Sequence, residues 1–308
     1  MHFSTYLKLC REKSGLTQEK LVSELYIHDM DNFKYLDNSM LSKWERNFAE
    51  PKVLKQVSII KFFQKRIGGA LPCWDGYSID DVEEMICKAG MEHLLGKSKK
   101  LVLNFPSDVM HTKNLRIFQL HDSNMFDKVI NINMDLDKSF NHNMTHVKST
   151  QFKKWALHPS SSFFVCVYKD EFFGLLFTLR LKPEVFEKIM NLEMHENELT
   201  ENDFASFHEM GCNFMISLFA MNEKAASVLF IRYYAHLIAH QNMISEVGYA
   251  TMLEDTKKLL GSMNFFHCTS EPITKDFELQ TYRMTLSSFL ACENVVKTIL
   301  FGAECSEE

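Results

Sequence analysis

Short polar and basic side chains flank an apolar stripe in residues 36–46, which read LDNSMLSKWER. Met40, Leu41 and Trp44 are three and four residues apart, so they occupy one face of a helix. The outer face of that helix then carries Ser39, Ser42, Lys43 and Arg46. Side chains of this size and charge reach the base edges and phosphates of duplex DNA. The chemistry that this pattern predicts is recognition of DNA.

The boundaries of the neighbouring helices are visible around this segment. Asp37 or Asn38 can cap the helix itself, because a short side-chain oxygen accepts a free backbone N–H there. Upstream, a helix over residues 4–14 is expected to end at Gly15, since glycine is the usual residue after a helix. A second helix then opens with Thr17 as its cap.

Several of these residues follow one another in an order that is typical of one protein family: Arg11, Gly15-Leu16-Thr17-Gln18, Ser42-Lys43-Trp44-Glu45 and Pro51. In this order residues 3–64 resemble the Xre/Cro-type helix-turn-helix regulators. The resemblance implies that Arg11 pairs with Glu45 behind the recognition helix and that Gln18 anchors the sugar-phosphate backbone. It also implies that the side chains facing the major groove are Asn38, Ser39, Ser42 and Lys43. We hypothesise that Lys43 and Ser39 read bases, whereas the phosphates are held by Gln18, Lys20 and Arg46.

The sequence departs from that pattern in two places. Residues 26–35 form a ten-residue block where the family has a single glycine in its turn. Val22 stands where the family has a small alanine in the second helix. The block is expected to lengthen the second helix or to add a wing, and the valine to hold the second and third helices slightly further apart.

Composition excludes several other kinds of protein. The 308 residues are 46% hydrophobic and 24% charged, as in soluble globular proteins, and they suffice for two domains. The 8 cysteines stand singly, so neither a disulfide framework nor a cysteine-rich zinc site is predicted. No signal peptide and no apolar run of membrane length is visible. We therefore expect a cytoplasmic protein without membrane contact.

The net charge of −6 is unevenly distributed along the chain. Residues 1–66 hold 12 Lys and Arg against 8 Asp and Glu, a balance of +4, which leaves −10 for the remainder. A basic head on an acidic body suits phosphate contact by the head alone. We therefore expect double-stranded DNA to be bound by a homodimer at an inverted repeat, with half-sites about one helical turn apart.

The chain is predicted to divide into three contiguous parts. A helix over residues 53–65 closes the first part, and Gly68-Gly69 marks the start of a linker. Ser78 with Asp81 forms a capping-box-like start for an amphipathic helix to about Leu95, whose apolar face serves packing or dimerisation. The three parts are a DNA-binding domain over 1–66, a linker with a connecting helix over 67–100, and a second domain over 101–308.

Strand-like and helix-like segments alternate in this second domain. Residues 163–168 and 172–181 are strongly β-forming and are joined by Lys169-Asp170-Glu171, so we expect a hairpin there. The other expected strands are 101–105, 115–120, 213–220, 247–252, 265–269 and 282–286. The other expected helices are 125–140, 151–157, 223–241, 254–262 and 292–301.

The hairpin sequence FVCVYKDEFFG, with Gly174 at its end, and the stretch 254–266 resemble parts of the GNAT acyltransferase fold. The resemblance covers residues 115–290 and rests mainly on the order of the elements. The expected fold class is an all-helical helix-turn-helix domain followed by a mixed-sheet GNAT-like α/β domain. The resemblance implies that an acyl-CoA pyrophosphate is held on backbone N–H groups at a helix N-terminus.

Two features that this resemblance implies for catalysis are missing. The turn over residues 221–227 has no glycine to let a phosphate approach, and Glu223 adds negative charge there. The general-acid tyrosine would fall on Leu260, which has no proton to donate, and Asn264 replaces the glycine that follows. We therefore expect no catalytic residue, no cofactor and no enzymatic activity, and a domain that serves dimerisation, ligand sensing or partner binding.

His236 and His240 are four residues apart, as zinc-binding pairs are, but the sequence indicates no third ligand, so no metal is expected. The predicted function is that of a sequence-specific DNA-binding transcriptional regulator with a small-molecule or protein effector. The alternative is an active acyl-CoA-dependent N-acyltransferase fused to a DNA-binding domain. A third hypothesis is a protein-interaction module of the antitoxin or phage-regulator type.

Overall fold

A computed structural model describes residues 1–71, 74, 77–98, 115–140, 147–275 and 277–300. The chain forms two compact units. The N-terminal unit comprises residues 1–98, 234–241 and 287–308, and the sheet unit comprises residues 99–233 and 242–286. Each unit is thus assembled from separate stretches of the chain, whereas the division that the sequence predicts is contiguous.

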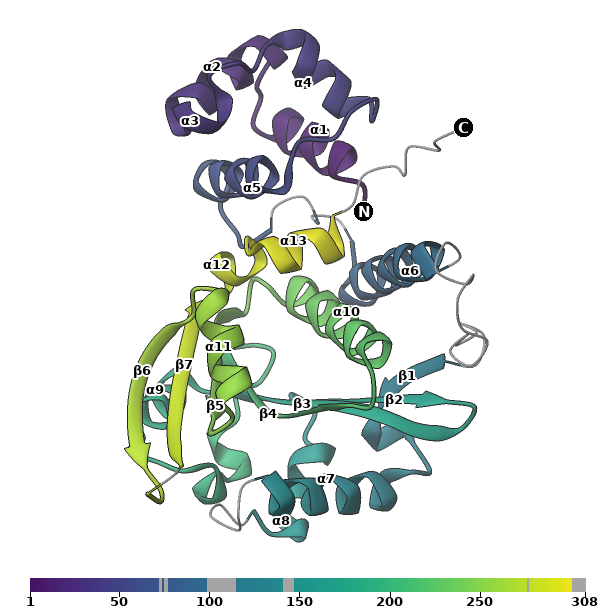
Figure 1. Cartoon of the computed structure of the whole chain (residues 1–308), viewed down its shortest axis with the longest axis vertical. Helices are drawn as coiled ribbons and strands as arrows, with labels where there is room; N and C mark the ends of the chain where they lie inside the picture. The colour runs from purple at the N-terminus through teal and green to yellow at the C-terminus, as the bar shows by residue number, and fades with distance from the viewer. Residues whose placement is uncertain (72–73, 75–76, 99–114, 141–146, 276, 301–308) are drawn as a thin grey trace. The chain divides into compact units, whose positions relative to one another are not determined.

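Five helices begin the N-terminal unit (Figure 1), and two of them start at the predicted caps. The Thr17 side chain accepts a hydrogen bond from the Lys20 amide at 3.2 Å, and the Asp37 side chain accepts one from the Met40 amide at 2.7 Å. Gly15 has a φ of 65°, which suits the residue after a helix. The helices are α1 (Phe3–Lys13), α2 (Gln18–His28), α3 (Met30–Phe33), α4 (Asn38–Glu45) and α5 (Val53–Ile67).

The apolar stripe of α4 packs into the core of these helices. Leu41 is fully buried and Trp44 is 4% exposed, as their spacing predicts. Tyr6 of α1 and Phe63 of α5 meet edge to face with ring centroids 6.5 Å apart, an arrangement that aromatic pairs favour. Burying this stripe orients α4 so that its polar side faces away from the core.

The block over residues 26–35 lengthens α2 to His28 and adds the short helix α3, and these ten described residues contain no strand. Asp29 joins the two helices and also ties them to α5. Its carboxylate accepts hydrogen bonds from the Asn32 amide at 3.2 Å, the Asn32 side chain at 2.8 Å and the Ser58 hydroxyl at 2.6 Å. The predicted lengthening of the second helix is therefore confirmed, and the predicted wing is wrong.

Replacing Asp29 by Ala is expected to lower the free energy of unfolding by about 1 kcal/mol at pH 7, because a helix cap is lost. Burial by itself raises the pKa of Asp29, but the hydrogen bonds from Ser58 and Asn32 outweigh it and hold the pKa below its ordinary value. The carboxylate therefore stabilises the fold above its unfolded pKa of about 4, and this contribution is lost as the pH falls through the lower folded pKa.

Urea unfolding of the full chain, followed by circular dichroism at pH 7 and pH 3, measures this difference. Asp31→Ala, at an exposed position in the same short helix, is the matched control. An Asp29→Ala difference that stayed constant down to pH 3 would show that the carboxylate charge contributes nothing.

The rest of the N-terminal unit comes from distant parts of the chain. Helix α6 (Ile79–Ser98) opens with the predicted capping box: the Asp81 amide donates to the Ser78 hydroxyl at 3.2 Å, and the Ser78 amide donates to the Asp81 carboxylate at 3.3 Å. Gln64 of α5 donates to the Ser287 carbonyl at 2.8 Å. Near the end of the chain the sequence predicts a single helix, whereas the structure has two, α12 (Leu286–Leu290) and α13 (Glu293–Ile299).

A seven-stranded mixed sheet forms the sheet unit, with strand order β1-β2-β3-β4-β5-β7-β6. Only β4 and β5 are parallel among the described neighbours, and all other pairs are antiparallel. This architecture is consistent with the GNAT-like α/β domain that the sequence predicts. The strands are β1 (Leu115–Gln119), β2 (Ser162–Tyr168), β3 (Glu171–Leu181), β4 (Gly211–Ala220), β5 (Ile244–Thr251), β6 (Phe266–Pro272) and β7 (Glu278–Thr285).

Each described strand confirms an expected one, and the strand expected over residues 101–105 lies outside the described residues. The tight turn of the β2–β3 hairpin has Lys169 and Asp170 at φ values of 51° and 64°, as two-residue hairpin loops require. Gly174 is needed beside β4, because a Cβ atom there would lie 2.7 Å from the Phe219 carbonyl oxygen.

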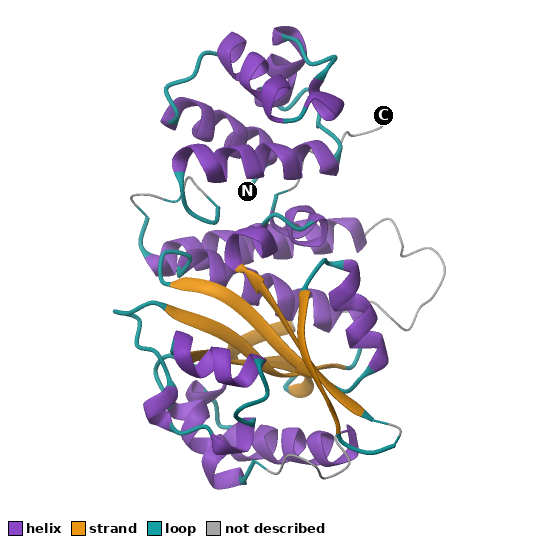
Figure 2. Ribbon diagram, turned by 90° about the vertical axis from the view of Figure 1, so that its left-hand side faces the viewer, coloured by secondary structure: helices purple, strands orange, loops and turns teal. Residues whose placement is uncertain are grey.

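Helices cover both faces of the sheet (Figure 2). One face packs on α7 (Phe126–Phe140), α8 (Ser149–Leu157) and α9 (Pro183–Met190), and the other is covered by α11 (Glu254–Ser262) and by α10 (Glu223–Ala239), whose last turns belong to the N-terminal unit. The α9 helix is not among the expected elements, and it begins at Pro183, shortly after β3 ends. No helix in the described part of the chain is long and apolar enough to cross a lipid bilayer.

Arg180 of β3 is 1% exposed and holds two loops of the sheet unit together. Its Nη2 donates to the carbonyl oxygens of Glu209 and Met243, the latter at 2.6 Å. Burial lowers the pKa of Arg180 from its ordinary value, and the nearby Glu209 carboxylate raises it. Two hydrogen bonds from one buried cation to backbone carbonyls fix where β4 and β5 begin.

We expect Arg180→Ala to lower the free energy of unfolding by about 3 kcal/mol, because both carbonyls lose a charged donor and a large buried side chain is removed. Arg116→Ala is the control: Arg116 of β1 is exposed and pairs with the exposed Asp170, and such pairs contribute about 0–1 kcal/mol. Denaturant midpoints of the two full-length variants give the comparison, and similar losses in both would contradict it.

Candidate functional site

The two parallel strands of the sheet separate at their carboxyl ends. The β4–β5 ladder runs from the pair Gly211–Ile244 to the pair Met215–Tyr249, although β4 continues to Ala220 and β5 to Thr251. Beyond the last pair, β4 stays paired with β3 and β5 stays paired with β7. Ligands of α/β sheets bind at such carboxyl ends, where neighbouring strands leave a crevice.

A β-bulge coincides with this separation. In the β3–β4 register, Phe177 lies opposite Ser217 and Thr178 lies opposite Met215, so Ile216 is an extra residue on β4. A bulge bends its strand and re-aims the side chains that follow it. The bend directs the second half of β4 away from β5.

A small cavity of about 70 Å³ lies beside the bulge. It is lined by the separating strands, by α9, by the segment after α9 and by residues at the β6–β7 turn. At about 30 Å³ per water molecule, it has room for a short ligand group. The lining residues are Ile189, Leu192, Met194, His195, Glu196, Ile216, Ala250, Thr251, Met252, Ile273 and Leu279.

His195 is the residue in this lining whose ring nitrogen can accept a proton from a neighbouring group. Its Nε2 lies 3.7 Å from Oε2 of Glu271 on β6. Its backbone amide donates to the Glu198 carboxylate at 2.7 Å, which fixes the turn that carries it. No spacing in the sequence marks His195, because Glu271 lies on a distant strand.

The turn after β4 is as the sequence predicts. Helix α10 begins at Glu223, and its first turn is capped by the Asn222 side chain, which accepts from the Ala225 amide at 2.9 Å. Residues 221–227, which are all described, contain no glycine, so no glycine in this turn lets a phosphate approach the backbone closely. Lys224 follows Glu223 and offsets its charge in the same turn.

Leu260, the position expected for a proton donor, is 3% exposed in α11. Asn264 has a φ of 62°, a left-handed conformation that asparagine tolerates better than most residues other than glycine. Asn264 therefore adopts a backbone conformation that glycine also adopts, and the Leu260 side chain has no proton to donate.

The second candidate site is the outer face of α4 in the N-terminal unit. Asn38, Ser39, Lys43 and Arg46 are exposed and Ser42 is half-buried. Arg46 folds back on its own helix, donating from Nε to the Ser42 carbonyl at 3.3 Å. Beside the helix lies a hollow of about 520 Å³ whose lining includes Ser39 and the basic residues Lys43, Lys52 and Lys55.

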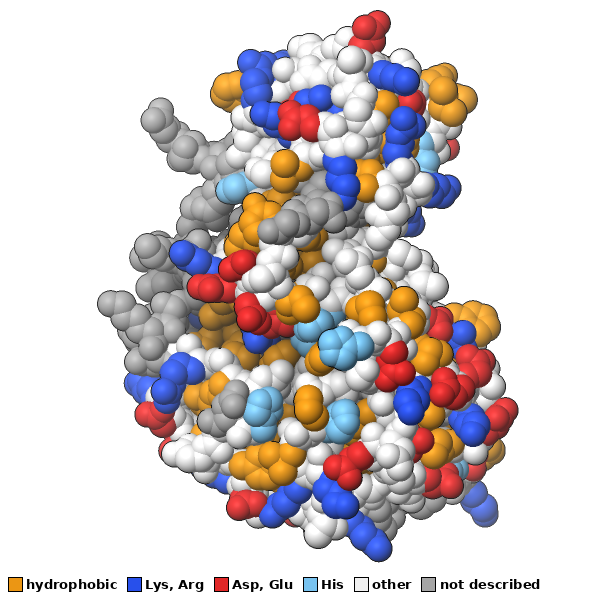
Figure 3. All heavy atoms as spheres, turned by 180° about the vertical axis from the view of Figure 1, so that it is seen from behind, with side chains coloured by type: hydrophobic (Ala, Val, Ile, Leu, Met, Phe, Trp, Pro, Cys, Tyr) orange, Lys and Arg blue, Asp and Glu red, His pale blue; other side chains and the backbone are white. Residues whose placement is uncertain are grey.

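Behind α4, Arg11 and Glu45 form the predicted pair. Arg11 donates to both Glu45 oxygens, from Nε at 2.5 Å and from Nη2 at 3.1 Å, and this hydrogen bonding raises the pKa of Arg11. Gln18 donates to the same carboxylate at 2.7 Å. Its expected contact with a phosphate stays a prediction, as does that of the exposed Lys20. On the face drawn in Figure 3, Lys and Arg side chains are spread over the N-terminal helices.

No known protein-family model matches this sequence, and no curated protein does. Among solved structures, the N-acyl amino acid synthase FeeM from uncultured soil microbes is similar at 8% identity and a TM-score of 0.39, covering 58% of this chain and 93% of its own. An N-acetyltransferase from Staphylococcus aureus Mu50 is similar at 11% identity and a TM-score of 0.34, with 56% and 97% covered. The polyamine N-acetyltransferase of Drosophila melanogaster is similar at 6% identity and a TM-score of 0.38, with 56% and 99% covered. Likenesses at this level identify no substrate, partner or reacting residue of this chain.

These comparisons correct the expectation that the chain is not an enzyme. The similar structures are described as acyl- or acetyltransferases, which contradicts that expectation. The turn without glycine and the leucine at position 260 remain true features. Neither feature excludes acyl transfer. The backbone of a strand can hold the acyl donor, and another residue or solvent can supply the proton that Leu260 cannot.

Proposed function

We propose that the sheet unit transfers an acyl group from acyl-CoA to an amine. The observation that carries this proposal is the early end of the β4–β5 ladder at Met215–Tyr249, with the Ile216 bulge beside it. The pantetheine arm of CoA is an extended chain with two amide groups. Such a chain pairs with a strand edge through main-chain hydrogen bonds, as an added strand does.

In this arrangement the pantetheine arm follows the second half of β4, and the acyl group enters the cavity lined by Ile216 and Ala250. The amine nitrogen attacks the thioester carbon, the C–S bond breaks, and CoA leaves as a thiolate. His195 takes the proton that the nitrogen loses, and solvent protonates the thiolate. The size of the cavity favours a short acyl group.

Calorimetry of the full chain with acetyl-CoA tests this proposal. Acetyl-CoA is expected to bind the native protein, and Ala250→Trp is expected to weaken binding by at least about tenfold, a loss of about 1.4 kcal/mol, because the larger ring fills the cavity. Leu157→Trp, at a position of α8 that is 62% exposed, controls for the added tryptophan. Ile216→Trp repeats the test from the other strand. Absence of acetyl-CoA binding by the native protein would overturn the proposal.

Sequence-specific binding to double-stranded DNA is the second function that we propose, for the N-terminal unit. The observation in its favour is the exposure of Ser39, Lys43 and Arg46 on a helix whose opposite face is buried. A homodimer would place two α4 helices in successive major grooves of an inverted repeat. The chain would then be an acyltransferase fused to a DNA-binding domain that regulates transcription.

A further inference from the structure

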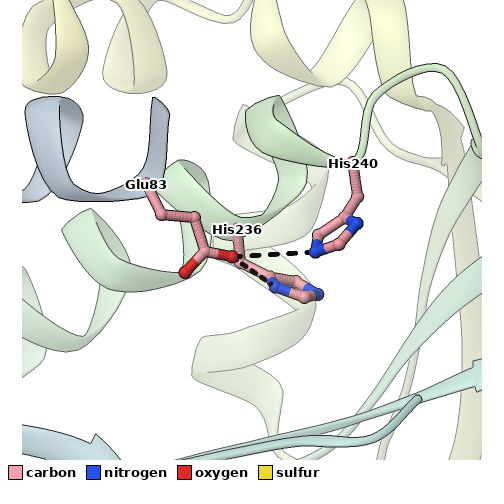
Figure 4. A group of neighbouring side chains, drawn as sticks. All are labelled: Glu83, His236 and His240. Carbon is pink, nitrogen blue, oxygen red and sulfur yellow. Dashed lines mark hydrogen bonds and ion pairs between the residues drawn. The ribbon is translucent and has the colours of Figure 1, made fainter. Parts of the chain in front are cut away.

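Three side chains from separate parts of the N-terminal unit meet at one point (Figure 4). Glu83 extends from α6, His236 extends from the last turn of α10, and His240 directly follows the last residue of that helix. Oε1 of Glu83 lies 2.9 Å from Nδ1 of His236 and 3.8 Å from Nε2 of His240. The two imidazole rings lie side by side with centroids 4.5 Å apart. The structure therefore supplies the third side chain that the sequence did not indicate.

The spacing of these atoms suits one metal ion. One ligand atom from each residue lies within 4.8 Å of the other two, and among the described residues this is the one group of three found to do so. Zinc–nitrogen and zinc–oxygen bonds are about 2.0–2.2 Å long, so ligand atoms of a tetrahedral site are about 3.3 Å apart. The separations of 2.9 Å and 3.8 Å from the Glu83 oxygen lie on either side of that value, and small side-chain rotations would equalise them.

Burial adds a chemical reason. Glu83 is 8% exposed and His236 is 5% exposed, so the carboxylate has largely left water. Glu83 already has a hydrogen-bonding partner, Nδ1 of His236 at 2.9 Å, and a divalent cation held by both groups would be a stronger partner for a buried carboxylate. Two imidazoles with one carboxylate are a donor set that first-row transition ions prefer, whereas calcium and magnesium favour oxygen ligands alone.

We propose that Glu83, His236 and His240 bind a divalent transition-metal ion, with Zn²⁺ the best fit, and leave one coordination position for water. The ion would join α6 to the end of α10, which are far apart in the sequence. This site is separate from the cavity beside β4, and the proposal does not depend on acyl transfer or on DNA binding.

The test uses the full chain without a polyhistidine tag, treated with a chelator and then titrated with Zn²⁺ by calorimetry. We expect one equivalent to bind and the Tm to rise. Titration with Co²⁺ is expected to produce the intense visible bands of a tetrahedral site. Glu83→Gln and His240→Gln are each expected to weaken Zn²⁺ binding by at least about tenfold, a loss of about 1.4 kcal/mol, and to abolish the Co²⁺ bands.

Glu84→Gln, an exposed neighbour on α6, and His208→Gln, an exposed histidine of the sheet unit, are the matched controls and should bind as the native chain does. His240 is only half-buried, so its variant decides the test if Glu83→Gln does not fold. The proposal is overturned if the native chain binds no stoichiometric Zn²⁺, or if the Co²⁺ bands persist in His240→Gln.

Discussion

Replacing His195 by Gln is expected to lower the rate of acyl transfer by about 100-fold or more, the usual contribution of a general base. The affinity for acetyl-CoA should stay at its native value, because the imidazole acts on the amine and not on the donor. Glutamine keeps a polar side chain that can accept a hydrogen bond, so the turn that His195 shares with Glu198 should survive. Steady-state rates with acetyl-CoA and a panel of small amines, together with calorimetry, measure the two effects separately.

His208→Gln is the matched control, since this histidine is exposed and does not line the cavity. A variant with native rates would remove His195 from the mechanism. A variant with weakened acetyl-CoA binding and an unchanged maximal rate would show that His195 contacts acetyl-CoA and does not act as the base.

Short-range signals in the sequence predicted local structure well. The caps at Thr17, Asp37 and Ser78 depend on residues within three positions, and all three are observed. The hairpin at Lys169-Asp170 is equally local, since the turn and both strands are contiguous. The α9 helix had such a signal too, because Pro183 occupies the first helical position, where proline is favoured. It was missed because the same proline also ends β3.

Features that depend on distant residues could not be predicted in the same way. The Ile216 bulge is defined by the register of β4 against β3, which no neighbouring residue determines. Glu83 and His236 are 153 positions apart, so no spacing rule connects them. Arg11 and Glu45 are an exception: the pair is predicted and observed, because the resemblance of residues 3–64 to a known family pattern links the two positions. Residue types alone would have left both as surface charges.

The outer face of α4 leads to the other large expected effect. The double variant Ser39→Ala/Lys43→Ala is expected to lose specific DNA binding by about 100-fold or more, since each lost base contact costs about 1–3 kcal/mol. Both side chains are exposed, so their removal should leave the helix and the core intact. The fold of the variant is checked by circular dichroism and by its Tm.

The probe for this measurement is a duplex enriched from a random-sequence pool by the native full chain, with gel-shift titration at one fixed salt concentration. Lys61→Ala, which removes an exposed charge from α5, should weaken binding to all sequences alike and lower the salt slope by at most about 0.9. The double variant should instead lose its preference for the enriched duplex over random DNA, because base contacts carry sequence information and phosphate contacts do not. An unchanged preference would place the reading surface elsewhere in the molecule. Failure of the native chain to enrich any sequence would remove DNA recognition from this protein and leave α4 as an ordinary amphipathic helix.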